Sequence, residues 1–418
     1  MNSDSSRVVI TGLGMISPYG RGFQFFSAGI KKGEAAVRRL SLFQDELLSS
    51  QVAAEVPDFR PADHLPPLEV KRVPRVVPMA IGAVREALAG AGLDLEGRDA
   101  GLKETLGVLI GTGGGGIEFA EKQYEEYFVN QSRHVTPYCV SSSFVGMLSS
   151  EISIALGLHG MSHVISTGCT SSTDAMGYAY RMIRSGQEEI LITGGAESCI
   201  TPGLMAGFCR MKVVSSLYND RPTAASRPFD RDRDGFVLGE GAWIFVFESW
   251  AHAQKRRAKI YAEVLGYGST CDAYHRVAAK QDGVEPARAM KKAIEDSGVP
   301  LKNVRCINLH GTGTKLNDSV ETRAVKLVFG REALSISNTA LKSMIGHPQG
   351  ACGAAGVAAA IVSLNDHFVP PTVNYENPDP ECDLDYTPNR GVAKEVDYVL
   401  CNTIAFGSKN SALLVGRV

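Results

Sequence analysis

Several features that define membrane, secreted or nucleic-acid-binding proteins are missing from this sequence. No stretch approaches the roughly 18 consecutive apolar residues that a membrane-spanning helix needs, so no membrane span is expected. The formal net charge is only -2, which leaves no bulk positive field to neutralise nucleic-acid phosphates. The N-terminus is polar as far as Ser6 and its first apolar run is short, so no secretory signal peptide is predicted.

Paired cysteines are also missing. The nine cysteines are odd in number and scattered, and no two of them form a C-x-x-C pair. This usage disfavours a disulfide framework and is typical of a reducing compartment, so we expect a cytoplasmic protein. The 418 residues, 44% hydrophobic and 21% charged, have an ordinary globular composition and suffice for two domain-sized halves.

Short apolar runs that end in glycine alternate with helical patterns along the chain. The runs are Val8–Gly12, Gly107–Gly111, Ile190–Gly194 and Cys306–Gly311. The helical patterns include Val77–Ala91, Glu285–Ser297 and Ala351–Asn365. Such runs are typical of strands buried on both faces, and the alternation predicts α/β layers with mostly parallel sheets.

Two pairs of segments look alike and indicate an internal duplication. Gly107–Gly113 is similar to Cys306–Thr312, and Arg7–Gly14 is similar to Tyr261–Gly268. The alternative is that parallel strands of any α/β protein share such patterns.

Cys169 follows an apolar strand pattern that breaks at Gly168, and a helix of small residues is predicted directly after it. Backbone amides and the helix dipole at a helix N-terminus favour a thiolate, so we expect a lowered thiol pKa. The same amides can stabilise an oxyanion on a thioester carbonyl. This pattern is typical of a nucleophile elbow, and a buried structural cysteine is the alternative.

Two histidines lie beside glycine-rich turns of the same kind. His310 begins the motif His310–Thr314 at the expected carboxyl end of a strand, where open α/β sheets place ligands. His347 ends the motif Lys342–His347, and the positive end of the small-residue helix that follows should keep its ring neutral. Either histidine alone could be structural, but the coincidence with Cys169 favours a catalytic site. Neither lies in an H-x-x-x-H spacing, so we expect no metal ion.

These motifs resemble those of the type II elongating β-ketoacyl-(acyl-carrier-protein) synthases, which include the ketosynthase α subunits of type II polyketide systems. The likeness runs from about Arg7 to the last residues. It rests on Thr167–Ser171, His310–Thr314, Lys342–His347, Asn219–Pro222, Ala225–Asp230, Arg233–Val237, Gly239–Ala242, Asp272–His275, Pro370–Asn374 and Asn377–Tyr386.

The resemblance implies a thiolase-like α/β fold, in which duplicated βα halves stack as five layers in the order α/β/α/β/α. We expect an N-terminal half at 1–259 with the nucleophilic cysteine and a C-terminal half at 260–418 with both histidines. The implied activity is that of a KAS II-like acyltransferase, a 3-oxoacyl-(acyl-carrier-protein) synthase. It joins an acyl group on Cys169 to malonyl-carrier by decarboxylative Claisen condensation. No cofactor is implied, since acyl carrier protein brings the substrates on its phosphopantetheine.

The resemblance also implies roles for individual residues. Cys169 is the acylated nucleophile, and His310 and His347 serve decarboxylation and condensation. Lys342 and Glu321 resemble a buried pair behind the histidines, with Asp318 on the same polar shelf. The remaining implied positions are Thr312 and Thr314 at the pantetheine arm, Gly114 at the acyl tunnel, Phe406 at the gate and oxyanion hole, and Lys71, Arg72, Arg75, Arg210 and Lys212 at the carrier-docking surface.

Some positions depart from the family pattern. The gate Ala405–Asn410 carries Ala405 and Ser408 where the family commonly has glycine, so the gate is expected to move differently. Gly114 stands where fatty-acid members often carry Ile, and this difference predicts a roomier acyl tunnel. The elbow after Thr167 resembles polyketide ketosynthase α, whereas Leu238–Gly241 and Asp272–His275 resemble the fatty-acid enzyme. We favour a polyketide or polyene pathway over fatty acid biosynthesis.

Two other functions have to be distinguished from that of a condensing enzyme. A thiolase-type acyltransferase shares the fold but carries one histidine and a second catalytic cysteine, unlike the pair His310 and His347. A non-catalytic chain-length factor lacks the cysteine that is present here at 169. The sequence therefore favours catalysis, as a homodimer or as the partner-dependent subunit of a heterodimer with a chain-length-factor-like homologue.

Overall fold

Two long strands at the centre of the molecule, β1 (Val8–Ser17) and β10 (Ala262–Cys271), pair with each other and join two β-layers. The computed structural model describes residues 6–130 and 132–418, so the first five residues of the expected N-terminal half lie outside the described part. The main sheet has the strand order β12-β11-β15-β16-β10-β1-β9-β7-β5-β6, with β2 paired to β1.

The other strands of this sheet are β2 (Gly20–Arg21), β5 (Gly107–Gly111), β6 (Ser162–Ile165), β7 (Ile190–Glu197), β9 (Gly241–Ser249), β11 (Cys306–Asn308), β12 (Ser337–Thr339), β15 (Tyr398–Ala405) and β16 (Lys409–Gly416). Two small sheets contain β3 (Arg38–Arg39), β4 (Val52–Ala54) and β8 (Leu238–Gly239), and β13 (Phe368–Val369) and β14 (Val392–Ala393).

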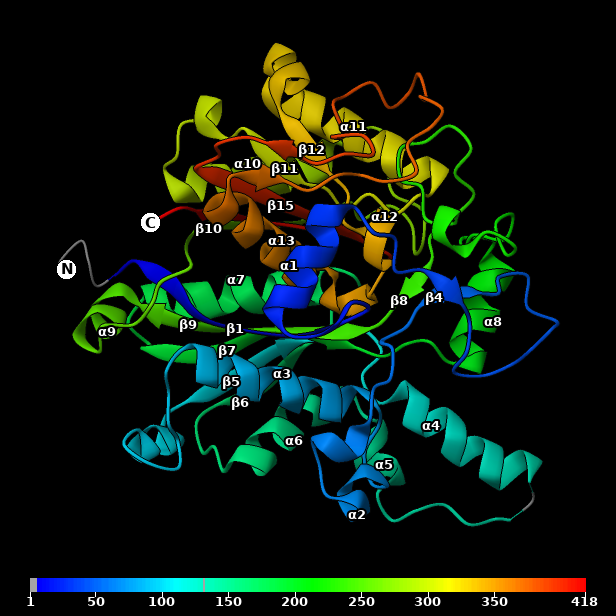
Figure 1. Ribbon diagram of the computed structural model, residues 1–418, viewed down its shortest axis with the longest axis vertical. Helices are drawn as coiled ribbons and strands as arrows, with labels where there is room; N and C mark the ends of the chain where they lie inside the picture. Colours follow the sequence, from blue (N-terminus) through cyan, green and yellow to red (C-terminus); the bar gives the residue numbers. More distant parts are fainter. Residues whose placement is uncertain (1–5, 131) are drawn as a thin grey trace.

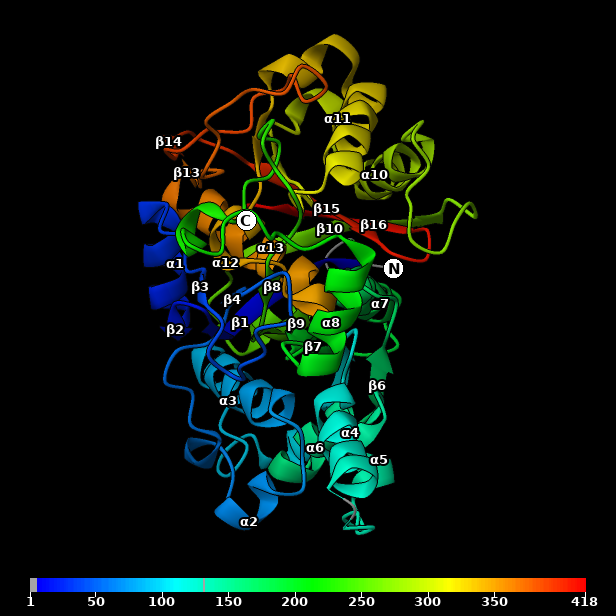
Figure 2. The same cartoon turned by 90° about the vertical axis from the view of Figure 1, so that its right-hand side faces the viewer.

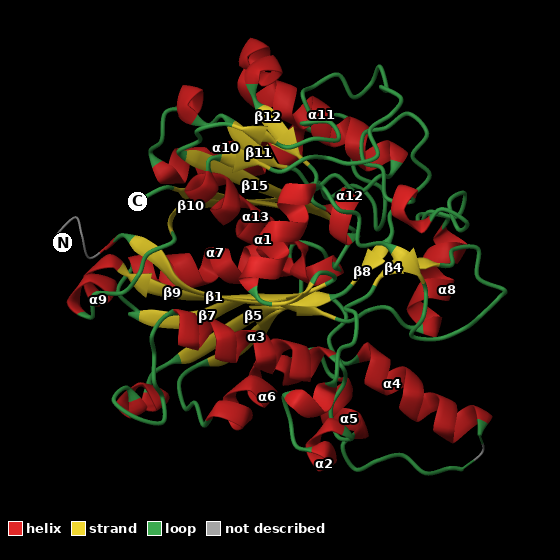
Figure 3. Cartoon of the chain, viewed as in Figure 1, coloured by secondary structure: helices red, strands yellow, loops and turns green. Residues whose placement is uncertain are grey.

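Helices form three layers around the two β-layers (Figure 1 and Figure 3). α10 (Val284–Ser297) and α11 (Lys315–Phe329) cover one outer face, and α3 (Val76–Gly90) and α6 (Met147–Leu156) cover the other. The central layer holds α1 (Phe23–Lys32), α7 (Ser171–Arg184) and α13 (Cys352–Asp366). The expected five-layer α/β/α/β/α fold is confirmed.

Shorter helices lie outside these layers or connect them (Figure 1 and Figure 2). They are α2 (Pro67–Val70), α4 (Ile117–Tyr124), α5 (Cys139–Ser143), α8 (Pro202–Met211), α9 (Trp250–Lys255) and α12 (Lys342–Ile345). Within the described residues, no helix has the length and apolarity to cross a membrane.

The internal duplication is visible in how β1 and β10 contact their helices. Both strands have a register shift, between Ile10 and Gly12 in β1 and between Val264 and Gly266 in β10. A Cβ on Gly12 would lie 2.3 Å from the carbonyl oxygen of Ala87 in α3, and one on Gly266 would lie 2.1 Å from that of Ala293 in α10. Only glycine permits either helix to approach its strand so closely.

The expectation of mostly parallel strands is wrong. β5 and β11 do pair in parallel with their neighbours, but β1, β9, β10 and β16 pair antiparallel throughout. An apolar run indicates that both faces of a strand are covered by other layers. Antiparallel strands between two helical layers are covered in the same way as parallel ones. Strand direction is therefore not encoded in the run.

The central helix α13 explains how the active-site segments come together. All residues from Cys352 to Leu364 are buried, and they are mostly Ala, Gly and Val. A helix that is apolar on all sides belongs between layers, and small side chains let both sheets approach it. Its N-terminal end points to the turns that follow β6 and β11.

Candidate active site

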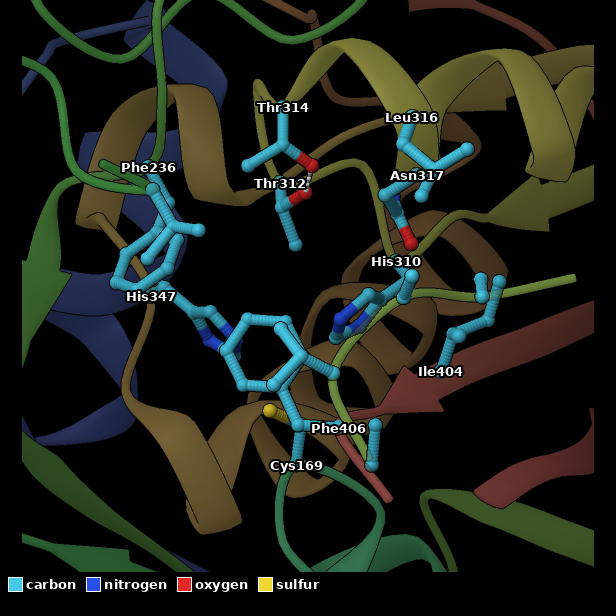
Figure 4. A pocket seen from close by; sticks show the side chains of 15 residues that line it. Cys169, Phe236, His310, Thr312, Thr314, Leu316, Asn317, His347, Ile404 and Phe406 are labelled. Carbon is cyan, nitrogen blue, oxygen red and sulfur yellow. Dashed lines mark hydrogen bonds between the residues drawn. The ribbon is translucent and has the colours of Figure 1, made fainter. Parts of the chain in front are cut away.

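Cys169, His310 and His347 line one cavity of about 180 Å³. The Cys169 sulfur and ring nitrogens of both histidines all lie within 4.8 Å of one another. Figure 4 shows the two rings facing the same space above the sulfur, with Phe406 beside it. The structure thus brings together the three residues that sequence motifs singled out.

The turn between β6 and α7 presents Cys169. Gly168 adopts a φ of +74°, and the backbone amide of Thr167 donates to Ser171 Oγ at 2.9 Å, which closes the turn. The expected lowering of the thiol pKa is wrong. Burial raises the pKa of Cys169 to about 12, and the opposing influence of Lys342 and of the Phe406 backbone amide is smaller. Cys169 is only 6% exposed, so its thiolate would lose more hydration free energy than these two groups return.

Two buried carboxylates of α11 hold the loop that carries His310. Glu321 accepts the backbone amides of His310 at 2.7 Å and Gly311 at 2.8 Å, as well as the Asn402 side chain. Asp318 accepts the backbone amides of Thr312 and Gly313. Burial raises the pKa of Glu321 to about 7. These bonds replace strand pairing where the chain leaves β11, so α11 sets the position of His310.

Lys342 lies against His310 and makes no ion pair with Glu321 among the residues described. Its Nζ is 2.6 Å from the His310 carbonyl oxygen and 3.3 Å from the ring Nδ1. The inferred Lys342–Glu321 pair is therefore corrected: the two residues hold His310 from opposite ends, one at its ring and one at its backbone amide. An ammonium that donates to Nδ1 leaves the proton of the neutral ring on Nε2.

His347 is held by a backbone bridge to Leu238 and by a 2.7 Å bond from its amide to the Val237 carbonyl. Its ring contacts Phe236 edge-on at 5.4 Å and the His310 ring edge-on at 5.2 Å. Burial, reinforced by the charge of Lys342, lowers the pKa of both histidines well below the usual range. The expected neutral ring at 347 is found, but burial is its main cause, because α13 begins only at Cys352.

Thr312, Thr314 and Phe406 line the same cavity, and the two threonine hydroxyls lie 2.9 Å apart (Figure 4). The gate that follows Phe406 is tied to the loop 272–276. Ser408, at a φ of +67°, donates through its hydroxyl to the His275 carbonyl at 2.8 Å. The serine that replaces a usual glycine thus makes a contact between the two loops that glycine could not make.

Gly114 does not lie in open space. A Cβ there would be 2.4 Å from the Cys199 sulfur, and the Gly114 amide faces Glu197. The Cys199 thiol therefore occupies the space that a side chain at position 114 would take, and the wider acyl tunnel at this glycine stays a prediction. Gly114 does not line the cavity that holds Cys169.

Three polar residues near Cys169 were missed by sequence reasoning. Glu197, fully buried at the end of β7, accepts backbone amides from Gly113 and Gly350. Cys352 donates its thiol to the Cys169 carbonyl at 3.2 Å, and Gln349 lies beside the Cys169 sulfur. Glu197 follows the two glycines near the end of an apolar run, and Gln349 and Cys352 follow His347 in the sequence. Their closeness to these motifs is the sequence feature from which they could have been predicted.

The expected docking residues differ in their surroundings. Arg75 is paired through two bonds with the buried Glu240 and is only 16% exposed at its side chain, so its assignment to docking is corrected to a structural ion pair. Arg72 binds Glu69 and covers the Tyr138 ring. Lys71, Arg210 and Lys212 are exposed.

Within the described chain, the cluster of Cys169, His310 and His347 is also the one group whose side chains could together hold a metal ion. Sulfur and imidazole nitrogen suit zinc, but a high thiol pKa opposes the thiolate that zinc binding requires. The expectation of no metal stays a prediction.

Comparisons with known proteins agree with this geometry. The model "Beta-ketoacyl synthase, N-terminal domain" matches residues 5–253, and "Beta-ketoacyl synthase, C-terminal domain" matches residues 261–376. The chain is 39% identical over 412 residues to the 3-oxoacyl-[acyl-carrier-protein] synthase 2 of Synechocystis sp., which covers 99% of this chain and 98% of that protein.

Solved structures of similar proteins cover 99% of both chains. The ishigamide ketosynthase/chain length factor matches with a TM-score of 0.91 and 35% identity. AntDE:AntF, a type II PKS acyl-carrier protein in complex with its ketosynthase bound to the hexaketide, matches with a TM-score of 0.89 and 30% identity.

Proposed function

The chain belongs to the beta-ketoacyl synthase family and is a KAS II-like condensing enzyme, and on this premise we propose that Cys169 carries the acyl group while His310 and His347 serve the malonyl thioester. The observation that carries the proposal is the close approach of one sulfur to two imidazoles whose pKa values are lowered well below the usual histidine range by burial. Neutral imidazole rings can donate hydrogen bonds to the substrate without placing a positive charge in the buried cavity.

Acyl transfer comes first. The Cys169 sulfur attacks the thioester carbon of the acyl-carrier, its proton passes to the departing carrier thiol, and an acyl-enzyme forms. Because burial raises the thiol pKa to about 12, the resting residue is a thiol that ionises only as the carbonyl approaches. The amides of Cys169 and Phe406 are our candidates for the donors to the oxyanion. The Phe406 backbone amide is one of the groups that oppose the rise in the Cys169 pKa, which places it on the thiolate's side of the balance.

Decarboxylation follows when the malonyl thioester binds above the acyl group. His310 donates from Nε2, since Lys342 occupies its Nδ1, and His347 donates beside it to the same carbonyl oxygen. Negative charge grows on that oxygen as carbon dioxide leaves, and one preorganised donor of this kind is worth about 3 kcal/mol. The resulting carbanion attacks the acyl thioester, forms the new C–C bond and releases the Cys169 sulfur.

Thr312 and Thr314 are our candidates for the contacts to the pantetheine arm. Their hydroxyls line the cavity on the side away from Cys169, where the arm would enter (Figure 4). The proposed carrier is an acyl carrier protein, and the exposed Lys71, Arg210 and Lys212 provide positive charge for an acidic partner.

We also propose a dimer, either with a second copy or with a chain-length-factor-like homologue. Among the strands that the structure describes, β6 is an edge strand whose one paired neighbour is β5, so its outer side is available for pairing. Near it, exposed apolar side chains lie after α4 (Phe128), directly after α5 (Phe144) and in α6 (Ile154). The ishigamide relative pairs a ketosynthase with a chain length factor.

Three further assignments complete the proposal: the division into halves, the location and the pathway. The division into halves at 259 and 260 is supported by the start of β10 at Ala262, the strand that repeats β1. A cytoplasmic location and a polyketide or polyene pathway remain our preferred context. Free sulfur in all nine cysteines supports a reducing compartment.

The decisive experiment incubates the purified protein with malonyl-carrier and a panel of acyl-carriers, and intact mass spectrometry follows both the enzyme and the products. We expect an acyl adduct on the wild type, no adduct on Cys169→Ala, and chain-extended β-ketoacyl-carrier only from the wild type. Cys271→Ala, at an exposed cysteine that does not line the cavity, is the control. Extended product formed by Cys169→Ala would refute the assignment.

A further inference from the structure

Gln349 places an unpaired amide beside the nucleophile. Its Oε1 lies 3.7 Å from the Cys169 sulfur, while its Nε2 is buried and has no hydrogen-bond partner among the residues described. The residue as a whole is only 9% exposed. Buried polar groups in proteins are nearly always paired, so an unpaired donor next to a reactive sulfur calls for a functional explanation.

Hydrogen bonds of the neighbouring backbone fix the position of Gln349 on both sides. The amide of the next residue, Gly350, donates to the buried Glu197 at 2.9 Å, and that of His347 donates to Val237 at 2.7 Å. Between them Gln349 adopts a φ of +34°, a conformation that L residues rarely take. Such strain persists where surrounding contacts impose it, and it is frequent at functional sites. The side chain is therefore presented to the sulfur by a rigid turn.

Acylation changes what this amide faces. In the resting enzyme the Cys169 thiol can donate to Oε1. In the acyl-enzyme that proton is gone, so Oε1 loses the donor that faces it, and the first carbons of the acyl group stand next to the side-chain amide. A saturated hydrocarbon chain would leave both ends unpaired. A chain with a carbonyl oxygen would give Nε2 the acceptor that it lacks.

We propose that Gln349 is a specificity-determining residue that selects acyl groups with a carbonyl oxygen at C3, that is, unreduced β-ketoacyl chains, over saturated ones. C3 is the third atom from the sulfur, and the thioester oxygen itself is directed to the amides of Cys169 and Phe406. The inference rests on the proposed function, because it concerns the acyl group on Cys169. Sites built to hydrogen-bond a substrate group reject the analogue that lacks it.

The test uses two donors that differ by one oxygen, acetoacetyl-carrier and butyryl-carrier. Rates of single-turnover acylation of the full-length protein are measured by intact mass spectrometry. We expect the wild type to prefer acetoacetyl and Gln349→Met to lose that preference by about tenfold, which corresponds to ~1.4 kcal/mol. Gln187→Leu, an exposed glutamine in the turn before β7, is the matched control and should keep the wild-type ratio.

The possible outcomes distinguish a failure of the inference about Gln349 from a failure of the proposed condensing function. Equal preference in the wild type and Gln349→Met, with both donors accepted, overturns the role of Gln349 and leaves the condensing activity intact. Acylation by neither donor, while other acyl-carriers of the panel are accepted, overturns the inference, and acylation by none of the panel refutes the proposed function itself. Gln349→Leu serves if the Met variant does not fold, as judged by circular dichroism. A wild type that prefers butyryl overturns the inference without any variant.

Discussion

Lys342 binds His310 twice, through the ring Nδ1 at 3.3 Å and through the backbone carbonyl at 2.6 Å. One side chain thereby sets both the tautomer of the ring and the end of the strand that carries it. Because Nδ1 accepts, Nε2 must carry the proton of a neutral imidazole and can donate into the cavity. The relationship assigns Lys342 the role of positioning a hydrogen-bond donor.

Lys342→Met should therefore impair decarboxylation more than acylation. Without the ammonium the proton of His310 can move to Nδ1, and the donor to the malonyl carbonyl is lost. We expect carbon dioxide release from malonyl-carrier to fall about 10²-fold, the usual effect of one lost donor. Acylation of Cys169 should change far less. Lys302→Met, at an exposed lysine, is the control, and equal losses in both steps would contradict the assignment.

His310→Ala and His347→Ala should retain acylation and lose condensation. Neither ring is needed to expel the carrier thiol, whereas both are aimed at the charge that forms on the malonyl oxygen. Intact mass should show the acyl adduct on each variant, and product analysis should show at least about a 10²-fold loss of extended chain. A variant that condenses but cannot be acylated would reverse these roles.

Alkylation of Cys169 by iodoacetamide should accelerate with pH without reaching a plateau below about pH 9. Burial raises the thiol pKa to about 12, so the thiolate fraction rises tenfold for each pH unit across this range. The rate is measured at the Cys169 peptide by mass spectrometry, with exposed Cys271 in the same digest as the reagent control. A plateau near pH 7 would show that the thiolate is already formed in the resting enzyme.

Glu321→Gln should destabilise the protein by about 1–3 kcal/mol and slow condensation. The Glu321 carboxylate accepts three hydrogen bonds, and in the variant the NH₂ group of glutamine would face one of those three donors. The free energy of unfolding is measured in urea. Glu381→Gln, an exposed carboxylate, is the control and should unfold like the wild type. Wild-type stability in Glu321→Gln would mean that its contacts to His310 and Gly311 contribute nothing.

Arg75→Met and Arg210→Glu should separate structure from docking. Removing Arg75 leaves the buried Glu240 unpaired, a change that costs about 3–5 kcal/mol in comparable cases, and should lower the free energy of unfolding. Arg210→Glu should leave stability within about 0.5 kcal/mol and raise the KM for acyl-carrier, more strongly at low salt. A raised KM with unchanged stability for Arg75→Met would restore its docking role.

The sequence alone determined the layered α/β fold, its main helices and strands, and the three residues that meet in the cavity. Strand, glycine turn and helix start are set by neighbours in the chain, so the patterns around Cys169, His310 and His347 could be read locally.

Contacts across the layers were decided only by the tertiary structure. They include the partner of Lys342, the pairing of Arg75 with Glu240 across 165 positions, and the unpaired amide of Gln349. The thiol pKa belongs with them, because desolvation depends on everything packed around the sulfur and outweighed the local effect of the helix end. A motif specifies which groups stand at a turn, whereas burial and distant partners set their charge and their hydrogen bonds.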